Sequence, residues 1–150
     1  MPETAARLPL REALSYLNWL YNPFHGLDAS GIYELLSTSS PTERGLYLNL
    51  GYWQQARDID EASDALAMLV GEQVGMGPGD TVLDLGFGYA DQDILWTRTL
   101  KPARIIGLNI TPSQVAVARA RIAELGLDDR IDLRLGSATD MPLPSASVDK

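Results

Sequence analysis

The segment over residues 81–88 constrains the fold of this chain more than any other. It reads Thr-Val-Leu-Asp-Leu-Gly-Phe-Gly, a short and mostly apolar run followed directly by a glycine-rich turn. Short apolar runs of this kind are typical of buried strands in parallel sheets. A glycine-rich turn after such a strand lets the backbone approach a ligand closely at the carboxyl edge of the sheet. The segment therefore predicts a parallel sheet with a ligand site beside its first strand.

Alternating strands and helices continue this pattern towards the C-terminus. Further buried strands are predicted over residues 104–108 and 131–135, with helices over about 91–100 and 112–125 between the strands. Strands joined by crossover helices run parallel, and the connections are right-handed. The predicted fold is therefore α/β, an open parallel sheet in which the strands present lie in the order 3-2-1.

Helix-start signals place two of the helices. Asp58 or Asp60 is expected to cap a helix that begins near residue 58, and its apolar stripe is predicted at Ile59, Ala62, Leu66, Leu69 and Gln73 or Val74. Pro112 suits the first position of the later helix, where Thr111 and Gln114 match a capping box. The apolar stripe of that helix is predicted at Val115, Ala118, Ile122 and Leu125.

The chain is expected to divide into two parts. Residues 1–57 are predicted to form a helical extension, with helices over about 9–20 and around 32–36, followed by an apolar and aromatic block over residues 46–53. Residues 58–150 are predicted to be the N-terminal half of the sheet domain. Because residues 148–150 resemble the start of a fourth strand that would pair with the first, we expect the chain to be a portion of a longer protein.

The composition excludes several classes of function. The 150 residues, enough for one domain, hold 20 acidic and 12 basic side chains, and residues 58–93 carry nine acids and no base. This balance argues against a nucleic-acid partner, since no basic stripe is present. With no cysteine and a single histidine, His25, thiolate and multi-histidine metal sites are excluded, and we expect no metal. No segment is typical of a signal peptide or membrane span, so a cytoplasmic location is expected.

The glycine-rich turn departs from a dinucleotide-binding fingerprint. That fingerprint has a third glycine where this chain has Asp91, and an acid for the ribose where it has Asn109. Asp84, two residues before the first glycine, suits a ligand with a positive charge better than a pyrophosphate. A nicotinamide-dependent oxidoreductase is therefore kept only as a less favoured alternative.

Three blocks in order resemble the class I S-adenosylmethionine-dependent methyltransferases. They are residues 48–53 (Leu-Asn-Leu-Gly-Tyr-Trp), residues 82–88 (Val-Leu-Asp-Leu-Gly-Phe-Gly) and residues 107–114 (Gly-Leu-Asn-Ile-Thr-Pro-Ser-Gln). They are similar to the small-molecule group that contains the erythromycin-type sugar O-methyltransferases and the related tocopherol, sterol and cyclopropane-fatty-acid enzymes. The resemblance implies a Rossmann-like fold, S-adenosylmethionine as cofactor and methyl transfer to a small-molecule acceptor. Oxygen is the favoured acceptor atom.

The resemblance also implies which residues bind the cofactor. The methionine end would be held by Asp84, Gly86 and Gly88 beneath Tyr52 and Trp53, the ribose by Asn109 and Gln114, and the adenine by the loop with Ala138, Thr139 and Asp140. Simpler roles stay open: a helix-capping partner for Gln114, core aromatics for Tyr52 and Trp53, and a loop acid for Asp140. No catalytic residue is assigned, because in the resembling families the acceptor pocket and any base come mainly from the later half of the domain. The alternative function is a non-catalytic module that binds S-adenosylmethionine or a nucleoside.

Overall fold

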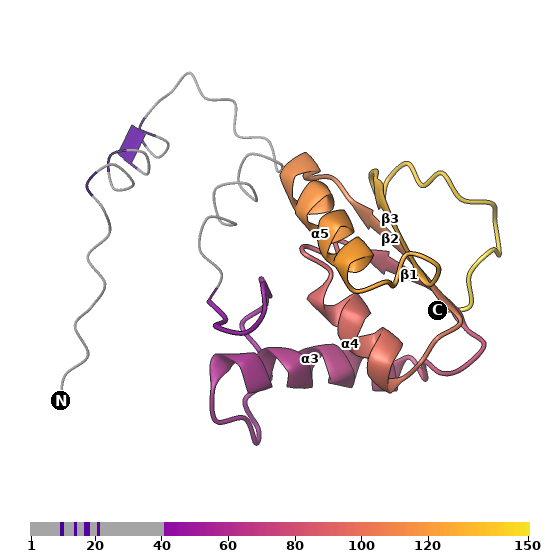
Figure 1. The fold of residues 1–150 in the computed structure, drawn as a ribbon, viewed down its shortest axis with the longest axis horizontal. Helices are drawn as coiled ribbons and strands as arrows, with labels where there is room; N and C mark the ends of the chain where they lie inside the picture. The colour runs from indigo at the N-terminus through magenta and orange to yellow at the C-terminus, as the bar shows by residue number, and fades with distance from the viewer. Residues whose placement is uncertain (1–9, 11–13, 15–16, 19–20, 22–40) are drawn as a thin grey trace.

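The computed structural model describes residues 41–150 and, before them, Leu10, Leu14, Leu17, Asn18 and Tyr21. The elements in chain order are α3 (Ile59–Gln73), β1 (Thr81–Leu85), α4 (Asp91–Thr99), β2 (Arg104–Asn109), α5 (Pro112–Glu124) and β3 (Ile131–Leu135). The parallel sheet has the order β1-β2-β3, which confirms the predicted fold class (Figure 1).

The predictions for the N-terminal extension fall mostly outside the described residues. Of the helix predicted over residues 9–20, the described positions Leu10, Leu14, Leu17 and Asn18 are helical. The helix predicted around residues 32–36 and His25 lie outside the described residues. Within the part of the chain that the structure describes, no helix has the length and apolar character needed to cross a membrane.

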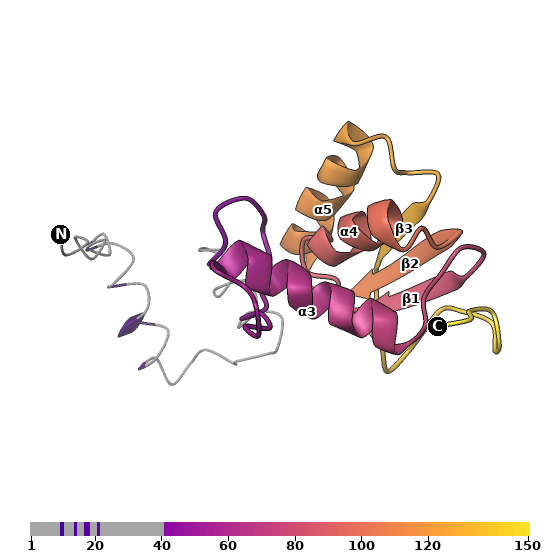
Figure 2. The same cartoon turned by 90° about the horizontal axis from the view of Figure 1, so that it is seen from below.

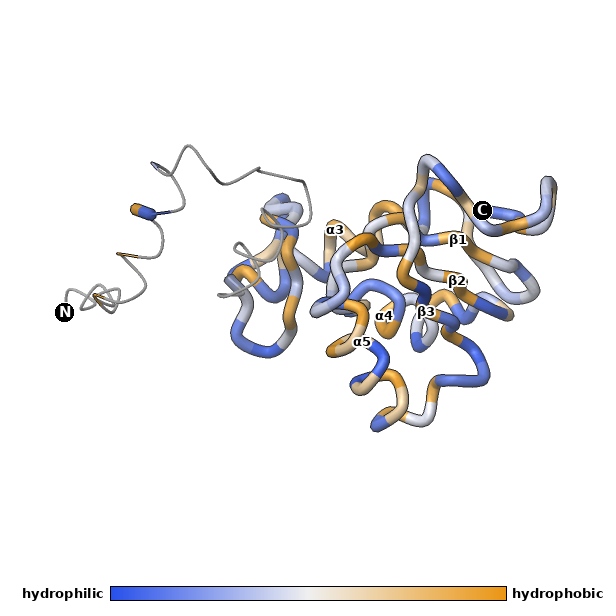
Figure 3. The backbone as a smooth tube through the Cα atoms, turned by 90° about the horizontal axis from the view of Figure 1, so that it is seen from above, coloured by the Kyte–Doolittle hydropathy of each residue, from blue (hydrophilic) through white to orange (hydrophobic). Residues whose placement is uncertain are grey.

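The hydrophobic core lies between the sheet and the helices on one of its faces. Figure 2 shows α4 and α5 on the same face of the sheet, as right-handed crossovers in one direction require, with α3 packed against α4. Along α5 hydrophobic and hydrophilic residues alternate, as in a helix with one buried side (Figure 3). Buried apolar residues from both layers meet there, among them Val82, Ile94, Trp96, Ile105, Val115, Ala118, Ile122, Ile131 and Leu133.

Phe87, in the middle of the glycine-rich turn, is anchored in this core. Its side chain is 2% exposed and lies over the backbone of Gly107 in β2. A Cβ at Gly107 would lie 2.6 Å from Phe87 Cδ1 and 2.6 Å from Leu133 Cδ2. The neighbouring Gly86 N–H donates to the Leu108 carbonyl at 2.7 Å. The position of the turn is therefore fixed by the middle of the sheet.

The start of α3 confirms one predicted cap and gives the other acid a different role. Asp58 is the N-cap, and its carboxylate accepts from the Glu61 N–H at 2.7 Å. Asp60 is buried and accepts instead from the backbone N–H groups of Glu43 and Arg44, at 3.0 and 2.9 Å. Asp60 thus attaches the segment before α3 to the domain.

The apolar stripe predicted for α3 is confirmed only at Ala62: Ile59, Leu66 and Leu69 are partly buried, and Gln73 and Val74 are exposed. The buried side of the helix is lined by Asp60, Ala62, Ser63, Ala67 and Gly71. The reason is close packing against α4: Trp96 Nε1 donates to the Ala67 carbonyl at 2.8 Å, and a Cβ at Gly71 would lie 2.5 Å from Leu100 Cδ1. Small residues, rather than leucines, allow this approach of the helix backbones. In α5 the predicted stripe is confirmed at Val115, Ala118 and Ile122, whereas Leu125 is exposed.

The predicted capping box at α5 is also wrong. Thr111 is the N-cap, but its side chain makes no capping hydrogen bond. Gln114 Oε1 accepts from Asn109 Nδ2 at 2.8 Å, so its side chain turns towards the end of β2 and not back to the helix start. The Thr111 N–H is satisfied by Asn109 Oδ1 at 3.3 Å.

Residues 149 and 150 lie along the edge of β1 opposite β2. Asp149 N–H donates to the Thr81 carbonyl at 2.8 Å, and Leu83 N–H donates to the Lys150 carbonyl at 2.9 Å. The Asp149 carboxylate also accepts from the Thr81 N–H at 2.8 Å. This is the position predicted for the beginning of a fourth strand.

Candidate ligand-binding cleft

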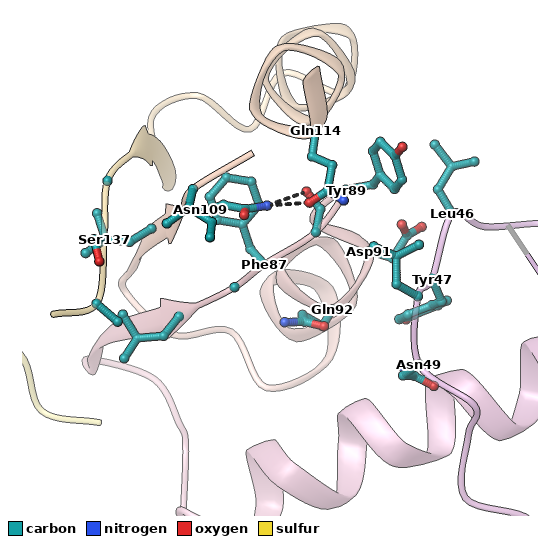
Figure 4. Close-up of a pocket in the computed structure, with 18 residues that line it drawn as sticks. Leu46, Tyr47, Asn49, Phe87, Tyr89, Asp91, Gln92, Asn109, Gln114 and Ser137 are labelled. Atoms are coloured by element: carbon teal, nitrogen blue, oxygen red, sulfur yellow. Dashed lines mark hydrogen bonds between the residues drawn. The ribbon is translucent and has the colours of Figure 1, made fainter. Parts of the chain in front are cut away.

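A cleft of about 540 Å³ opens at the carboxyl ends of β1 and β2 (Figure 4). Its floor is the glycine-rich turn and the end of β2, and one wall is the loop after β3. The opposite wall comes from the irregular segment before α3. The lining residues drawn from these segments include Leu46, Asn49, Gly86, Gly88, Gln92, Asn109, Gln114 and Ala138.

The backbone of the turn forms the floor of the cleft. Gly86 and Gly88 have positive φ angles of 84° and 59°, a conformation that glycine adopts without strain. A Cβ built at Gly86 would meet nothing within 4 Å. Ala90 follows with φ 67° and is the N-cap of α4. Both predicted glycines therefore line the cleft, and their backbone is accessible to a ligand.

Asp84 is not among the residues that line the cleft. Its side chain lies behind Gln92, whose Nε2 donates to Asp84 Oδ2 at 2.6 Å. Gln92 itself does line the cleft (Figure 4). Sequence reasoning missed Gln92, although its place in the first turn of the helix after the glycine-rich turn was a usable signal.

Asp93 was also missed, and it forms a carboxyl pair with Asp84. The Asp93 side chain is completely buried near the Asp84 carboxyl, and within the described residues neither of its oxygens has a hydrogen-bond partner of normal geometry. Burial, followed by the charge of Asp84, raises the pKa of Asp93 well above its usual value. Burial also raises the pKa of Asp84, while the hydrogen bonds from Gln92 and Asp93 lower it. Because both pKa values are raised, and that of Asp93 the more strongly, this buried carboxyl pair favours retention of a proton.

Asn109 and Gln114 form a buried amide pair at the end of β2. Asn109 Nδ2 donates to Gln114 Oε1 at 2.8 Å and makes a long contact of 3.4 Å with the Gly88 carbonyl. Both side chains line the cleft, and dashed lines in Figure 4 mark the hydrogen bonds there. The structure therefore brings these two predicted residues together with Gly86 and Gly88.

Only part of the loop after β3 reaches the cleft. Ser137 and Ala138 line it, whereas Thr139 and Asp140 are exposed and lie outside the lining. Ser137 Oγ lies 2.8 Å from Thr139 Oγ1, and the Asp140 N–H donates to the Ser137 carbonyl at 3.2 Å. The loop is thus a local turn whose first residues face the cleft.

Tyr52 and Trp53 also lie outside the lining. They are 36% and 53% exposed, so they are not core aromatics. Trp53 Nε1 donates to the Leu50 carbonyl at 2.8 Å. Tyr47 is the aromatic residue of this segment that does line the cleft, and its OH donates to Asp64 at 2.7 Å. Burial first, and then this hydrogen bond, raises the pKa of Tyr47.

Among the described residues, no three histidine, aspartate or glutamate side chains come together as metal ligands. The chemical character of the cleft instead comes from backbone groups and amides. Within the same described part of the chain, no lysine, arginine or histidine lines the cleft, and the acid that does, Asp91, is paired with Arg121. Such a cleft favours neutral or cationic ligands rich in hydrogen-bond donors.

A family model described as "Methyltransferase domain" matches residues 82–150. The chain is 42% identical to the erythromycin 3''-O-methyltransferase of Saccharopolyspora erythraea, over 79% of this chain and 39% of the relative. It is 30% identical to methyltransferase GfsG of Streptomyces halstedii, over 69% of this chain and 38% of the relative. The chain thus spans about two fifths of the length of these curated relatives.

Solved structures share the same fold. The cyclase SpnF superimposes with a TM-score of 0.64 at 30% identity, covering 69% of this chain and 38% of that one. A geranyl diphosphate methyltransferase, solved in complex with S-adenosylmethionine, superimposes with a TM-score of 0.56 at 25% identity, covering 61% of this chain and 37% of that one.

Proposed function

Because a family model of methyltransferase domains matches residues 82–150, we propose that the chain binds S-adenosylmethionine in the cleft for methyl transfer to a small molecule. In this proposal residues 58–150 are the cofactor-binding part, and the segment over residues 46–53 covers it. The cofactor supplies a methyl group on a positively charged sulfur. The residues of the chain bind and orient it and exclude water.

The observation that carries the proposal is the composition of the cleft around the glycine-rich turn. Its volume of about 540 Å³ is in the range of small-molecule and cofactor sites. The described lining has no cationic side chain, and the carboxyl of Asp84 lies behind Gln92, so the electrostatic environment suits a cation. A nicotinamide dinucleotide, with its pyrophosphate, would find no cationic partner in this lining.

Each wall has a role in this proposal. The backbone of Gly86 and Gly88 would hold the methionine end, with Asp84 acting behind them. Asn109 and Gln114 would face the ribose hydroxyls, since amides both donate and accept. Ala138, with Thr139 and Asp140 beyond it, would border the adenine, and the exposed rings of Tyr52 and Trp53 would move over the sulfonium.

Oxygen is the acceptor atom that we favour. The relative at 42% identity is named a 3''-O-methyltransferase, and another relative, at 29% identity, is named a 27-O-demethylrifamycin SV methyltransferase. No catalytic base is assigned among the described residues. A module that binds the cofactor without transferring its methyl group remains the second candidate, because SpnF, at 30% identity, is named a cyclase.

Isothermal titration calorimetry tests the cofactor assignment. We expect S-adenosylmethionine and S-adenosylhomocysteine to bind the purified chain, and NADH to show no heat of binding. Tighter binding of NADH than of S-adenosylhomocysteine would overturn the proposal. Transfer of a radiolabelled methyl group to macrolide-type alcohols would then separate the enzyme from the binding-only module.

A further inference from the structure

Gln92 lies between the buried carboxyl pair and the cleft, and its neighbours set the orientation of its side-chain amide. The buried carboxyl of Asp84 lies behind Gln92 and accepts a hydrogen bond from its side-chain amide. The amide end of Gln92 that faces Asp84 at 2.6 Å must therefore be the NH₂ group. Its oxygen, Oε1, is left to point away from Asp84.

The oxygen of Gln92 has no hydrogen-bond partner among the described residues. The side-chain amide makes its hydrogen bond to Asp84 through Nε2, and Gln92 lines the cleft beside the glycine-rich turn. Figure 4 shows the side chain lying between Phe87 and the segment that carries Tyr47 and Asn49. An acceptor oxygen is thus held at the cleft wall, with the carboxyl of Asp84 directly behind its amide.

We infer that Gln92 is the side chain that contacts the cationic methionine end of the bound cofactor, accepting a hydrogen bond through Oε1, and that Asp84 is a positioning residue that fixes the direction of the Gln92 amide. The inference rests on the proposed function and deepens it. It differs from the expectation for Asp84 in one respect: the acid acts through Gln92 and does not touch the ligand.

The nature of the ligand group follows from the same geometry. An acceptor backed by a carboxyl group favours an N–H donor with positive charge, because the hydrogen bond to Asp84 polarises the amide in the favourable direction. The described lining holds no cationic side chain that would compete with a cationic ligand for this oxygen. Ammonium groups meet these requirements, whereas carboxylates and phosphates do not.

The first test replaces Gln92 by Met, which has a similar length and no amide. S-adenosylhomocysteine and adenosine are compared as ligands by calorimetry, since adenosine lacks the methionine arm. We expect Gln92→Met to weaken the binding of S-adenosylhomocysteine by about tenfold or more, which is the usual effect of losing a hydrogen bond to a charged group. The binding of adenosine should weaken by less than about twofold. An equal effect on the two ligands, or no effect on either, would overturn the role of Gln92.

The second test exchanges the two polar groups. In Asp84→Asn the new amide at position 84 has an NH₂ group that donates to Gln92 Oε1, which turns the Gln92 NH₂ group towards the cleft. We expect this variant to lose affinity for S-adenosylhomocysteine by about tenfold. In Asp84→Asn/Gln92→Glu the carboxylate at position 92 accepts from the amide at position 84 and presents its other oxygen to the cleft, so affinity should return.

The outcomes distinguish the role of Asp84 from the binding of the cofactor by the chain. A double variant that binds no better than Asp84→Asn would show that Asp84 itself contacts the ligand, which overturns the positioning role. Failure of the wild-type chain to bind either ligand would contradict the proposed function instead. Thermal melts of each variant, followed by circular dichroism, show that the fold is intact.

Discussion

The guanidinium of Arg121 in α5 holds the carboxylate of Asp91 in α4 through two hydrogen bonds, at 2.7 and 2.8 Å. Arg121 also donates to the Tyr89 carbonyl at 2.6 Å, in the glycine-rich turn itself. Asp91 stands where a dinucleotide fingerprint would have its third glycine. In this chain that position links the turn to the next crossover helix through a charged pair.

Removing the positive charge of Arg121 should lower the free energy of unfolding. In Arg121→Met the Asp91 side chain, 9% exposed, keeps its charge without a partner, and we expect a loss of about 2–3 kcal/mol in the free energy of unfolding. Urea denaturation measures it. As a control, Arg104→Met removes an arginine that is 51% exposed from Asp132, which keeps its second partner Arg134, and should cost less than about 1 kcal/mol. Similar losses in the two variants would contradict the importance of the Arg121 pair.

The residues that follow α4 and α5 offer a paired test of backbone strain. Lys101 after α4 has φ 58°, and Gly126 after α5 has φ 63°. Because a side chain in this left-handed conformation costs about 1–2 kcal/mol, Lys101→Gly should stabilise the chain by about 1 kcal/mol. Gly126→Ala, where a Cβ would meet no atom within 4 Å, should destabilise it by a similar amount. Changes of the same sign in the two variants would show that the strain argument fails.

The buried carboxyl pair should give the stability of the chain an unusual dependence on pH. Burial, and then Asp84, raises the pKa of Asp93 when the chain folds, so above the unfolded pKa of 3.8 the folded state binds the extra proton. Stability is then lost as pH rises towards the folded pKa, by up to about 1.4 kcal/mol per pH unit. In Asp93→Asn the amide donates to Asp84 without taking up a proton. We expect this variant to melt higher than wild type at pH 8, with a smaller difference at pH 4; a constant difference would rule out the shared proton.

Asn109 provides a test of the ribose position. In Asn109→Asp the new carboxylate accepts from two hydroxyls, while Gln114 can turn its amide to donate to it. Since hydrogen bonds to ionised acceptors are the stronger ones, adenosine should bind about tenfold more tightly. Calorimetry with 2′,3′-dideoxyadenosine, which lacks both hydroxyls, is the control. Equal gains for the two nucleosides would place the ribose elsewhere.

The exposed Trp53 allows its expected movement to be followed directly. Its ring is 53% exposed, whereas Trp96 is buried against α3. If Trp53 covers the bound cofactor, its fluorescence should shift to shorter wavelength when S-adenosylhomocysteine is added. The same titration of Trp53→Phe should show no such shift. A shift that persists in this variant would assign the signal to another tryptophan.

The strands could be predicted from the sequence almost to the residue, because β1 and β2 are short, mostly apolar runs and β3 alternates apolar with charged residues. The bounds of β1 and β3 agree with the prediction, and β2 runs one residue further, to Asn109. The face of α3 could not be predicted in this way. Its buried side is determined by the close packing of Trp96 against Ala67 and Gly71. The spacing of large apolar residues in the sequence does not show how closely two helices pack.

Some residues of the cleft could likewise be predicted from the sequence, and others could not. Gly86 and Gly88 were found because they follow a strand at the carboxyl edge of the sheet, whereas Asn109 and Gln114 were assigned through the resemblance to the methyltransferases. Gln92 and Asp93 were missed because polar residues in the first turn of a helix are usually explained by the helix dipole. Only the three-dimensional arrangement shows that one of them is completely buried and that the other separates Asp84 from the cleft.

The insertion of Phe87 over Gly107 has a consequence for the time scale of the site. A loop whose central side chain is enclosed by the sheet cannot open without disrupting the core, so its amide protons should exchange with solvent only when the whole domain unfolds. The ligand then meets a rigid floor in every molecule of the population. Little conformational entropy is lost at this floor on binding, and discrimination between ligands is left to the side chains around it.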